Sequence, residues 1–334
     1  MMTETLNLVT TKDGEQIAVW KVVNSIKNRP AFKNPDFDNC ETGHSAIKAQ
    51  NIFLTHGTFS DKKACLRIAG YLAELGHHCY IMEWRDHGHS SVPKDKFNFE
   101  TVATYDLDAT FRYLFDELEL DNLHCVTHSG GGVCLTMFLI QQRLPQNRSS
   151  QSTDYIDKLS SISMFACQAY GAVLNPKSYA RILATKSFNR LFGYIPAKKL
   201  KLGTVNESYH TMVQWYDWNL NKDFKSSFIK QPVTGQKTIH QQAAQDENLD
   251  YRQHMPKITT PIYAISAKGD NFISPTRGCK LFFDDFSNPS NIFQEYSTAN
   301  GHLSDYTHSR IMMSRDAAKE IWPTVAAWID KHAK

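Results

Sequence analysis

The sequence predicts an α/β protein with a mostly parallel central sheet flanked by helices and an inserted, mostly helical cap. Short apolar runs of strand length alternate along the chain with segments of helix length. This alternation is typical of strands joined by crossover helices. It stops between residues 170 and 255, where aromatic and polar residues replace it. A chain of 334 residues is long enough for one large domain with such an insertion.

The first part of the predicted core is a hairpin followed by four buried strands. Residues 6–23 have strand character on both sides of the Asp13-Gly14 turn, which favours an antiparallel start to the sheet. The apolar runs that follow are short and continuous, as in strands that are buried on both faces. We predict these strands at 51–57, 79–84, 122–127 and 160–169. The expected helices cover 62–76, 99–120 and 133–142, and polar surface loops are expected at 27–48 and 146–154.

The C-terminal part returns to the same alternation. Strands are predicted at 261–267 and 291–297, with a helix at 275–286 between them and a last helix at 314–332. The chain should therefore divide into a core of residues 1–169 and 256–334 and a cap of residues 170–255. We expect the cap to lie over one end of the sheet.

Composition and charge are those of an ordinary globular protein. The net charge of +3 gives no argument for nucleic acid or an anionic membrane surface as a partner. We expect neither a signal peptide nor a transmembrane segment, because no long uncharged apolar stretch occurs. The seven cysteines are scattered, mostly in apolar runs, and form no CxxC pair. This pattern is typical of reduced thiols in a cytoplasmic protein without a structural zinc site.

Residues 125–135 (CVTHSGGGVCL) place a serine and three glycines between a strand-like run and a helix-like run. A serine at a sharp strand-to-helix turn needs small neighbours, because the turn crowds the backbone. Gly131 is such a neighbour, whereas Thr127 stands where a glycine is usual, so some strain is expected. The turn would place the hydroxyl above the carboxyl edge of the sheet, at the positive end of the next helix. We therefore predict Ser129 as a nucleophile.

The three glycines could instead form a phosphate-binding loop at a helix N-terminus. A P-loop would end in Gly-Lys-Ser/Thr, and a dinucleotide-binding loop would read GxGxxG. Neither pattern is present. The sequence therefore favours the nucleophile.

A serine nucleophile needs a histidine base and an acidic residue that orients it, in the chain order Ser, acid, His. Asp270 comes just after one predicted strand, and His302 comes after the next. Both residues should lie at the carboxyl edge of the sheet, where open α/β sheets bind ligands. We predict Asp270 as the acid and His302 as the base. The rivals that remain are Asp305 and Asp246 for the acid and His308 for the base.

Other polar groups near this edge have simpler explanations. His128 adjoins the predicted nucleophile, but neighbouring strand residues point to opposite sides, so we expect His128 to pack behind the turn. His87 and His89 are not accompanied by carboxylates or thiolates at ligand spacing, so a hydrogen-bonded loop is preferred to a metal site. Cys125 and Cys134 have apolar neighbours and are expected to be inert core thiols.

The chain resembles the α/β-hydrolase fold superfamily over nearly its whole length outside residues 170–255. The motifs LTHGT, WRDHGHSS, THSGGG, KGD and NGH carry the resemblance, in the family's order. Within the superfamily the chain is most similar to lysophospholipase-like and predicted bacterial serine hydrolases with a helical cap. The resemblance implies a catalytic triad and two oxyanion-hole donors, namely Ser129, Asp270 and His302, with the backbone N–H groups of Thr58 and Gly130.

These residues predict a serine hydrolase that cleaves carboxylic esters through an acyl-enzyme, with no metal or organic cofactor. The expected substrate is a small ester, of the kind taken by esterases, lipases or lysophospholipases, with an apolar acyl part. Phe59, Trp215 and Trp218 are expected to contact it. Two alternatives remain: acyl transfer by the same triad, and a non-catalytic ligand-binding role on a hydrolase scaffold. The pattern favours no particular oligomeric state.

Overall fold

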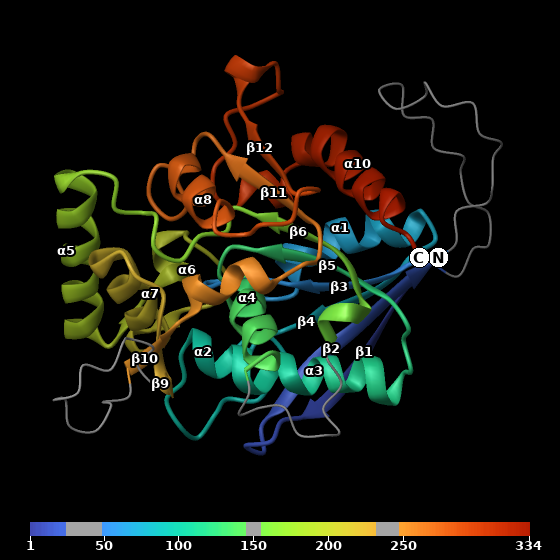
Figure 1. The fold of residues 1–334 in the computed structure, drawn as a ribbon, viewed down its shortest axis with the longest axis horizontal. Helices are drawn as coiled ribbons and strands as arrows, with labels where there is room; N and C mark the ends of the chain where they lie inside the picture. The colour runs from blue at the N-terminus through green and yellow to red at the C-terminus, as the bar shows by residue number, and fades with distance from the viewer. Residues whose placement is uncertain (25–48, 145–154, 232–246) are drawn as a thin grey trace, which may run out of the picture.

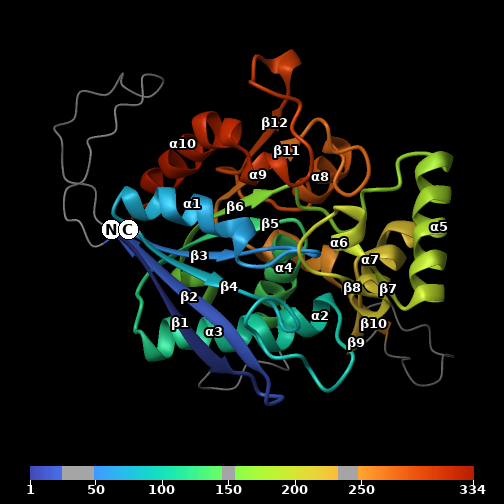
Figure 2. The same ribbon diagram turned by 180° about the vertical axis from the view of Figure 1, so that it is seen from behind.

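The computed structural model describes residues 1–24, 49–144, 155–231 and 247–334 (Figure 1). The loops predicted at 27–48 and 146–154 lie outside these residues. A central sheet with helices on both faces forms the body of the molecule, and the two chain ends lie close together at one side of it (Figures 1 and 2).

The described residues form a central sheet of eight strands in the order β1-β2-β4-β3-β5-β6-β11-β12. In this order the strands are β1 (Met2–Thr10), β2 (Gln16–Asn24), β4 (His78–Met82), β3 (Asn51–Thr55), β5 (Leu123–His128), β6 (Leu159–Phe165), β11 (Ile262–Ala267) and β12 (Ile292–Tyr296). The pairs β1–β2 and β2–β4 are antiparallel, and all the other neighbours are parallel. The predicted mostly parallel sheet with an antiparallel start is therefore confirmed.

Helices cover both faces of this sheet, which explains the continuous apolar runs of the inner strands. Successive residues of β3 point to opposite faces, so Phe53 joins one core cluster while Ile52 and Leu54 join the other. One face is covered by α1 (Lys63–Glu74), α9 (Arg310–Met313) and α10 (Arg315–Lys331). The other face is covered by α4 (Gly130–Gln142) and α8 (Thr276–Phe283).

The segment predicted as one helix over 99–120 is helical but not uniformly α-helical. It consists of α2 (Phe99–Thr101), the π-helical stretch η1 (Val102–Leu107), α3 (Asp108–Arg112) and a second π-helical stretch, η2 (Tyr113–Glu117). The Asn98 side chain accepts the backbone N–H of Thr101 at 2.9 Å and caps the start. The wider turns lie beside a buried ion pair, in which Asp106 of η1 accepts from Arg85 Nε at 2.8 Å.

The segment 170–255 contains more strand than the sequence predicted. Its elements are α5 (Pro176–Phe192), β7 (Tyr194–Ile195), α6 (Ala197–Leu200), β8 (Glu207–Ser208), α7 (Tyr209–Asn221), β9 (Lys225–Gln231), β10 (Glu247–Asp250) and the start of η5 (Tyr251–Lys257). The four strands form two separate antiparallel pairs. β7 and β8 have only two residues each, and β9 and β10 are largely polar, so the sequence has no apolar run that could reveal them. Helices α5, α6 and α7 lie together beyond one end of the central sheet (Figures 1 and 2).

Candidate active site

Ser129 lies at the junction between β5 and α4 with an unusual backbone conformation. Its φ of 53° and ψ of −126° fall in a region that residues other than glycine rarely occupy. Strand β5 ends at His128 and α4 begins at Gly130, so the serine occupies the turn itself. Such strain persists only where the surroundings enforce it, and it is characteristic of functional sites. The sharp strand-to-helix turn predicted from the glycine run is present.

The close approach of β3 to this turn explains why glycines are needed. A methyl group on Gly131 would lie 2.5 Å from the His56 carbonyl oxygen, and one on Gly57 would lie 2.7 Å from Ser129 Cβ. Neither distance leaves room for a side chain, because the obstacles are the backbone and Ser129 Cβ. The helix that follows Ser129 can therefore begin directly against the end of β3.

His308 joins Ser129 to Asp270. Its Nε2 lies 2.8 Å from Ser129 Oγ, and its Nδ1 lies 2.6 Å from Asp270 Oδ2. Asp270 is buried and follows β11, and its oxygens also accept backbone N–H groups, including those of Ile273 at 3.0 Å and Ser274 at 2.9 Å. Burial acts to raise the pKa of Asp270, but the hydrogen bond and charge of His308 and the backbone donors outweigh it and lower that pKa. Asp270 is therefore a carboxylate at neutral pH.

The predicted role of His302 as the base is not supported by the structure, because His302 follows β12 as expected but contacts neither Ser129 nor Asp270. A tight turn after β12 brings the His302 N–H to the Ser297 carbonyl oxygen at 3.1 Å. Its ring then packs on Tyr296, with ring centroids 4.4 Å apart, and its Nδ1 lies 3.2 Å from the Ser297 nitrogen. The chain continues for six more residues before a histidine reaches the serine.

Of the two rival acids, Asp305 does not replace Asp270. Asp305 Oδ1 accepts the Thr298 N–H at 2.7 Å and its hydroxyl at 3.0 Å, so it closes the turn after β12. Asp246 lies outside the described residues. His308 was the rival base in the sequence, and both histidines follow β12 in the same loop. The order Ser, acid, His alone therefore could not separate them.

His128 lines the pocket and contacts His308, rather than packing behind the turn as expected. Its Nε2 lies 2.9 Å from the His308 carbonyl oxygen, and the two rings are 4.9 Å apart. Burial and the neighbouring His308 lower the pKa of His128 to about 3. His128 is therefore neutral and donates its Nε2–H to the His308 backbone, which helps to hold His308 in place.

The predicted oxyanion donors lie beside the serine. Thr58 and Gly130 both line the pocket that contains Ser129. Gly130 is the first residue of α4, so its N–H has no acceptor within the helix. Phe59 also lines this pocket, with a positive φ of 65°. All three residues thus line the same pocket as Ser129, and the oxyanion role of Thr58 and Gly130 and the substrate contact of Phe59 stay predictions.

Glu207 connects the loop after β3 to the segment above it, and the sequence analysis missed this residue. Its Oε1 accepts the Phe59 N–H at 3.0 Å and lies 2.7 Å from His87 Nε2. A second hydrogen bond joins the same two segments: the Phe59 carbonyl oxygen accepts the Thr204 N–H at 2.8 Å. No local motif marks Glu207, because its partners are distant in the chain.

His87 is paired with Glu207 in a buried position. Its Nδ1 lies 2.8 Å from the Arg85 carbonyl oxygen, so both ring nitrogens already have partners and neither is available to a metal. Burial acts to lower the pKa of His87, but the charge and hydrogen bond of Glu207 outweigh it, and the pKa of His87 is raised. His89 Nδ1 lies 3.4 Å from Glu83 Oε2. The predicted hydrogen-bonded loop is present.

A large pocket opens above Ser129. Its volume is about 690 Å³, and its walls come from the ends of β3 and β5, from the loop that carries His308 and from residues 181–216. Most of the wall's surface is apolar, with contributions from Phe59, Phe188, Met212 and Trp215, and the wall also includes Lys63, Arg181 and Lys201. Such a pocket is large enough for a drug-sized molecule.

Trp218 does not line this pocket, so its predicted contact with substrate is not supported. It packs edge-on against Phe224 and Phe99, with ring centroids 4.9 Å and 5.9 Å away. Its indole N–H donates to the Lys225 carbonyl oxygen at 2.8 Å. Trp218 therefore belongs to the buried core beneath Trp215.

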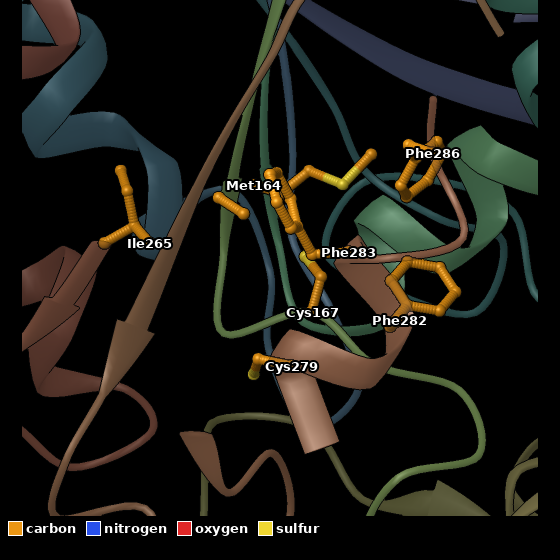
Figure 3. Close-up of a pocket in the computed structure, with 8 residues that line it drawn as sticks. Met164, Cys167, Ile265, Cys279, Phe282, Phe283 and Phe286 are labelled. Atoms are coloured by element: carbon orange, nitrogen blue, oxygen red, sulfur yellow. The ribbon is translucent and has the colours of Figure 1, made fainter. Parts of the chain in front are cut away.

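A much smaller cavity lies between β6, β11 and α8. Figure 3 shows Cys167, Cys279 and Phe282 around it, between β11 and α8. Its volume of about 10 Å³ is at the lower limit for one water molecule, so it cannot hold a substrate.

The six cysteines of the described chain are buried and free, and burial raises the pKa of Cys125 and Cys134. No helix among the described residues is long and apolar enough to cross a membrane.

The fold and the Ser129 turn define an α/β hydrolase, and comparison with known families agrees. The sequence profile of the alpha/beta hydrolase fold matches residues 50–301. The chain therefore belongs to the α/β-hydrolase fold family. No curated protein sequence matches it.

Solved structures share the fold at low sequence identity. A thermophilic esterase from Thermogutta terrifontis is 14% identical with a TM-score of 0.57, over 98% of this chain and 100% of that one. The esterase EaEST from Exiguobacterium antarcticum is 14% identical with a TM-score of 0.58, over 97% and 99%. The monoacylglycerol lipase of Paleococcus ferrophilus is 13% identical with a TM-score of 0.54, over 85% and 95%.

Proposed function

We propose that the protein is a serine hydrolase that cleaves carboxylic esters by a Ser129–His308–Asp270 triad. One observation carries this proposal: His308 lies within hydrogen-bond distance of both Ser129 and Asp270, at the floor of a large apolar pocket. A serine hydroxyl becomes a useful nucleophile when a histidine can take its proton and an acid holds the histidine. The base is thus His308, in place of the predicted His302.

The reaction begins with Ser129 Oγ attacking the ester carbonyl while His308 Nε2 takes the hydroxyl proton. Asp270 accepts the Nδ1–H of His308, which fixes the tautomer and stabilises the imidazolium that forms. The low pKa of Asp270 keeps it ionised for this role. His308 then gives the proton to the leaving alcohol, and an acyl group remains on Ser129. Water repeats the cycle, with His308 as its base, and releases the acid.

The backbone N–H groups of Thr58 and Gly130 stabilise the negative charge on the carbonyl oxygen in the transition state. The helix dipole of α4 adds to this, since Gly130 is the first residue of that helix. Glu207 contributes indirectly: by accepting the Phe59 N–H it holds the loop that carries Thr58. Glu207 is a positioning residue in this scheme.

The substrate is an ester with an apolar acyl part, and residues 170–255 form the cap that contains it. Trp215, Met212 and Phe188 of this segment line the pocket, which supports an apolar acyl group. Three structures with the same fold are described as esterases or a monoacylglycerol lipase, which supports the same class of substrate.

A fluorophosphonate probe followed by peptide mass spectrometry tests the proposal. We expect a single adduct on Ser129 in the wild type and in His302→Ala, and its loss in His308→Ala. The His302→Ala variant is the matched control, because both histidines lie in the loop that follows β12. Loss of the adduct in His302→Ala with retention in His308→Ala would restore the original assignment of the base. A correctly folded wild type that is not labelled would contradict the hydrolase itself.

A further inference from the structure

Residues 171–206 contain seven basic residues and no acidic one. Their positive charge exceeds the whole chain's excess of +3, so the rest of the protein is net acidic. A uniformly basic segment attracts anionic partners, even in a chain whose total charge is modest. The seven cations are Lys177, Arg181, Lys186, Arg190, Lys198, Lys199 and Lys201.

Most of these cations are exposed and have no ionic partner. Lys186 is paired with Asp217, while no ion pair holds the other six among the residues that the structure describes. The Arg181 guanidinium lies over the Phe272 ring, 3.8 Å from its centroid. All six are exposed. A cation that is neither buried nor paired keeps its charge available for a ligand outside the molecule.

The same segment exposes large apolar side chains. Leu191 is 80% exposed, Phe192 57%, Leu202 55%, Leu200 54% and Phe188 45%. They come from the C-terminal half of α5 and from α6 and the residues after it, and Phe188 and Phe192 are in contact on one side of α5. We call these five side chains, together with the unpaired cations Lys198, Lys199 and Lys201 that flank Leu200 and Leu202 in the chain, the cap face. Exposed apolar groups of this size gathered in one place mark an interaction site.

The cap face surrounds part of the entrance to the pocket. Phe188, Leu200, Lys201 and Leu202 are exposed to solvent and also line the cavity above Ser129. Helix α5 stands at the outer edge of the molecule in both views (Figures 1 and 2). A flat partner could therefore reach the cap face without meeting the core.

We propose that the cap face docks on an anionic lipid surface. Apolar side chains among lysines and arginines match such a surface, because the former enter the acyl boundary while the latter meet the headgroups. A second copy of the chain fits less well, since a two-fold contact through this face would bring cations against cations. Docking itself does not depend on the proposed chemistry. If that chemistry holds, an apolar ester enters the pocket directly from the lipid.

Flotation with lipid vesicles tests the docking without requiring activity. The full chain carrying Ser129→Ala is used, so that lipid is not consumed. We expect binding to vesicles of phosphatidylcholine and phosphatidylglycerol, weaker binding to phosphatidylcholine alone, and a decrease as salt is raised. Equal binding to both kinds of vesicle, or none to either, would overturn the proposal.

Two variants separate the charged and apolar parts of the cap face. In the same background, Lys198→Glu/Lys199→Glu should weaken binding to the anionic vesicles at least about tenfold. The matched control Lys319→Glu/Lys331→Glu makes the same charge change on α10, at exposed sites on another side of the molecule, and should change binding little. If both double variants lost vesicle binding equally, the net charge of the protein would explain the effect, and the proposal that the cap face docks would be overturned.

Leu191→Ser/Phe192→Ser should also weaken binding at least about tenfold, because it removes the side chains that enter the acyl boundary. Leu8→Ser, at a 53% exposed leucine of β1, is its control. Thermal unfolding should show that all these variants remain folded. A wild-type dimer in light scattering that Leu191→Ser/Phe192→Ser turns into a monomer would assign the cap face to a second copy instead.

Discussion

At the carboxyl edge of the sheet the functional side chains are buried and held by hydrogen bonds, whereas the segment above it exposes apolar side chains and unpaired cations. Ser129 and Asp270 are almost inaccessible, and His308 contacts both. On the cap face, Leu191 and Phe192 are mostly exposed. The difference fits the two proposals: a triad needs its groups held at fixed distances, whereas a docking surface must be open to a partner from outside.

The largest expected effect distinguishes two histidines of one loop. His308→Ala should lower kcat by about 10⁴-fold or more, because the serine loses its base. His302→Ala should leave kcat within about threefold, since its ring contacts Tyr296 and the Ser297 backbone but neither Ser129 nor Asp270. Steady-state hydrolysis of a short-chain ester measures both. A loss in His302→Ala as large as that in His308→Ala would contradict the assignment.

Two tryptophans of α7 should separate stability from specificity. Trp218→Ala should lower the free energy of unfolding by about 3 to 5 kcal/mol, because it removes a buried side chain between Phe99 and Phe224. Trp215→Phe should instead change the preference among acyl chain lengths, since Trp215 lines the pocket. Denaturant titration and an ester panel measure the two effects. An altered chain preference in Trp218→Phe, with none in Trp215→Phe, would reverse the roles.

Two glycines test how tightly each region is packed. Gly131→Ala should destabilise the protein by about 1 to 3 kcal/mol and reduce activity, because the new methyl group meets the His56 carbonyl oxygen and displaces α4. Gly193→Ala, after α5, has nothing within 4 Å but a φ of 77°, so it should cost about 1 kcal/mol and spare activity. Unfolding and ester hydrolysis are compared in both. Full activity in Gly131→Ala would show that the carboxyl edge of the sheet tolerates a displacement of α4.

The smallest expected effect concerns the Glu207–His87 pair, which joins the two regions. The pKa of His87 is higher in the folded protein than in the unfolded chain. The pair therefore stabilises the folded protein fully at pH values below the pKa of His87 in the unfolded chain, and this stabilisation is lost as pH rises through the pKa of His87 in the folded protein. Glu207→Gln should therefore destabilise the protein by on the order of 1 kcal/mol at about pH 6, and by less at about pH 9.

A readout of catalysis accompanies that measurement. Glu207→Gln should lower kcat more than it raises KM, since Glu207 holds the loop that carries Thr58. A destabilisation that is the same at both pH values would mean that the pair acts without charge. An unchanged kcat would reduce Glu207 to a structural role.

Much of the fold was predictable because its signals are local. Each inner strand is a short apolar run, since helices cover both faces of the sheet, and the serine turn shows itself by its glycines. The strand pairs in 170–255 were not predictable, because β7 and β8 have only two residues each and β9 and β10 are largely polar. The whole-chain charge of +3 also concealed the cap face, because a total cannot reveal how charge is distributed.

By itself, the sequence determined the sheet, the Ser129 turn, the candidate acid Asp270 and the loop that supplies the histidine. Tertiary structure alone decided that His308 occupies the place between them, because a tight turn at 298–301 holds His302 on Tyr296 and leaves the rest of the loop to reach back to Ser129. It also decided that Glu207 meets Phe59 and His87. Strand and turn signals depend on neighbours in the chain, whereas these contacts depend on how distant segments pack, which no local pattern encodes.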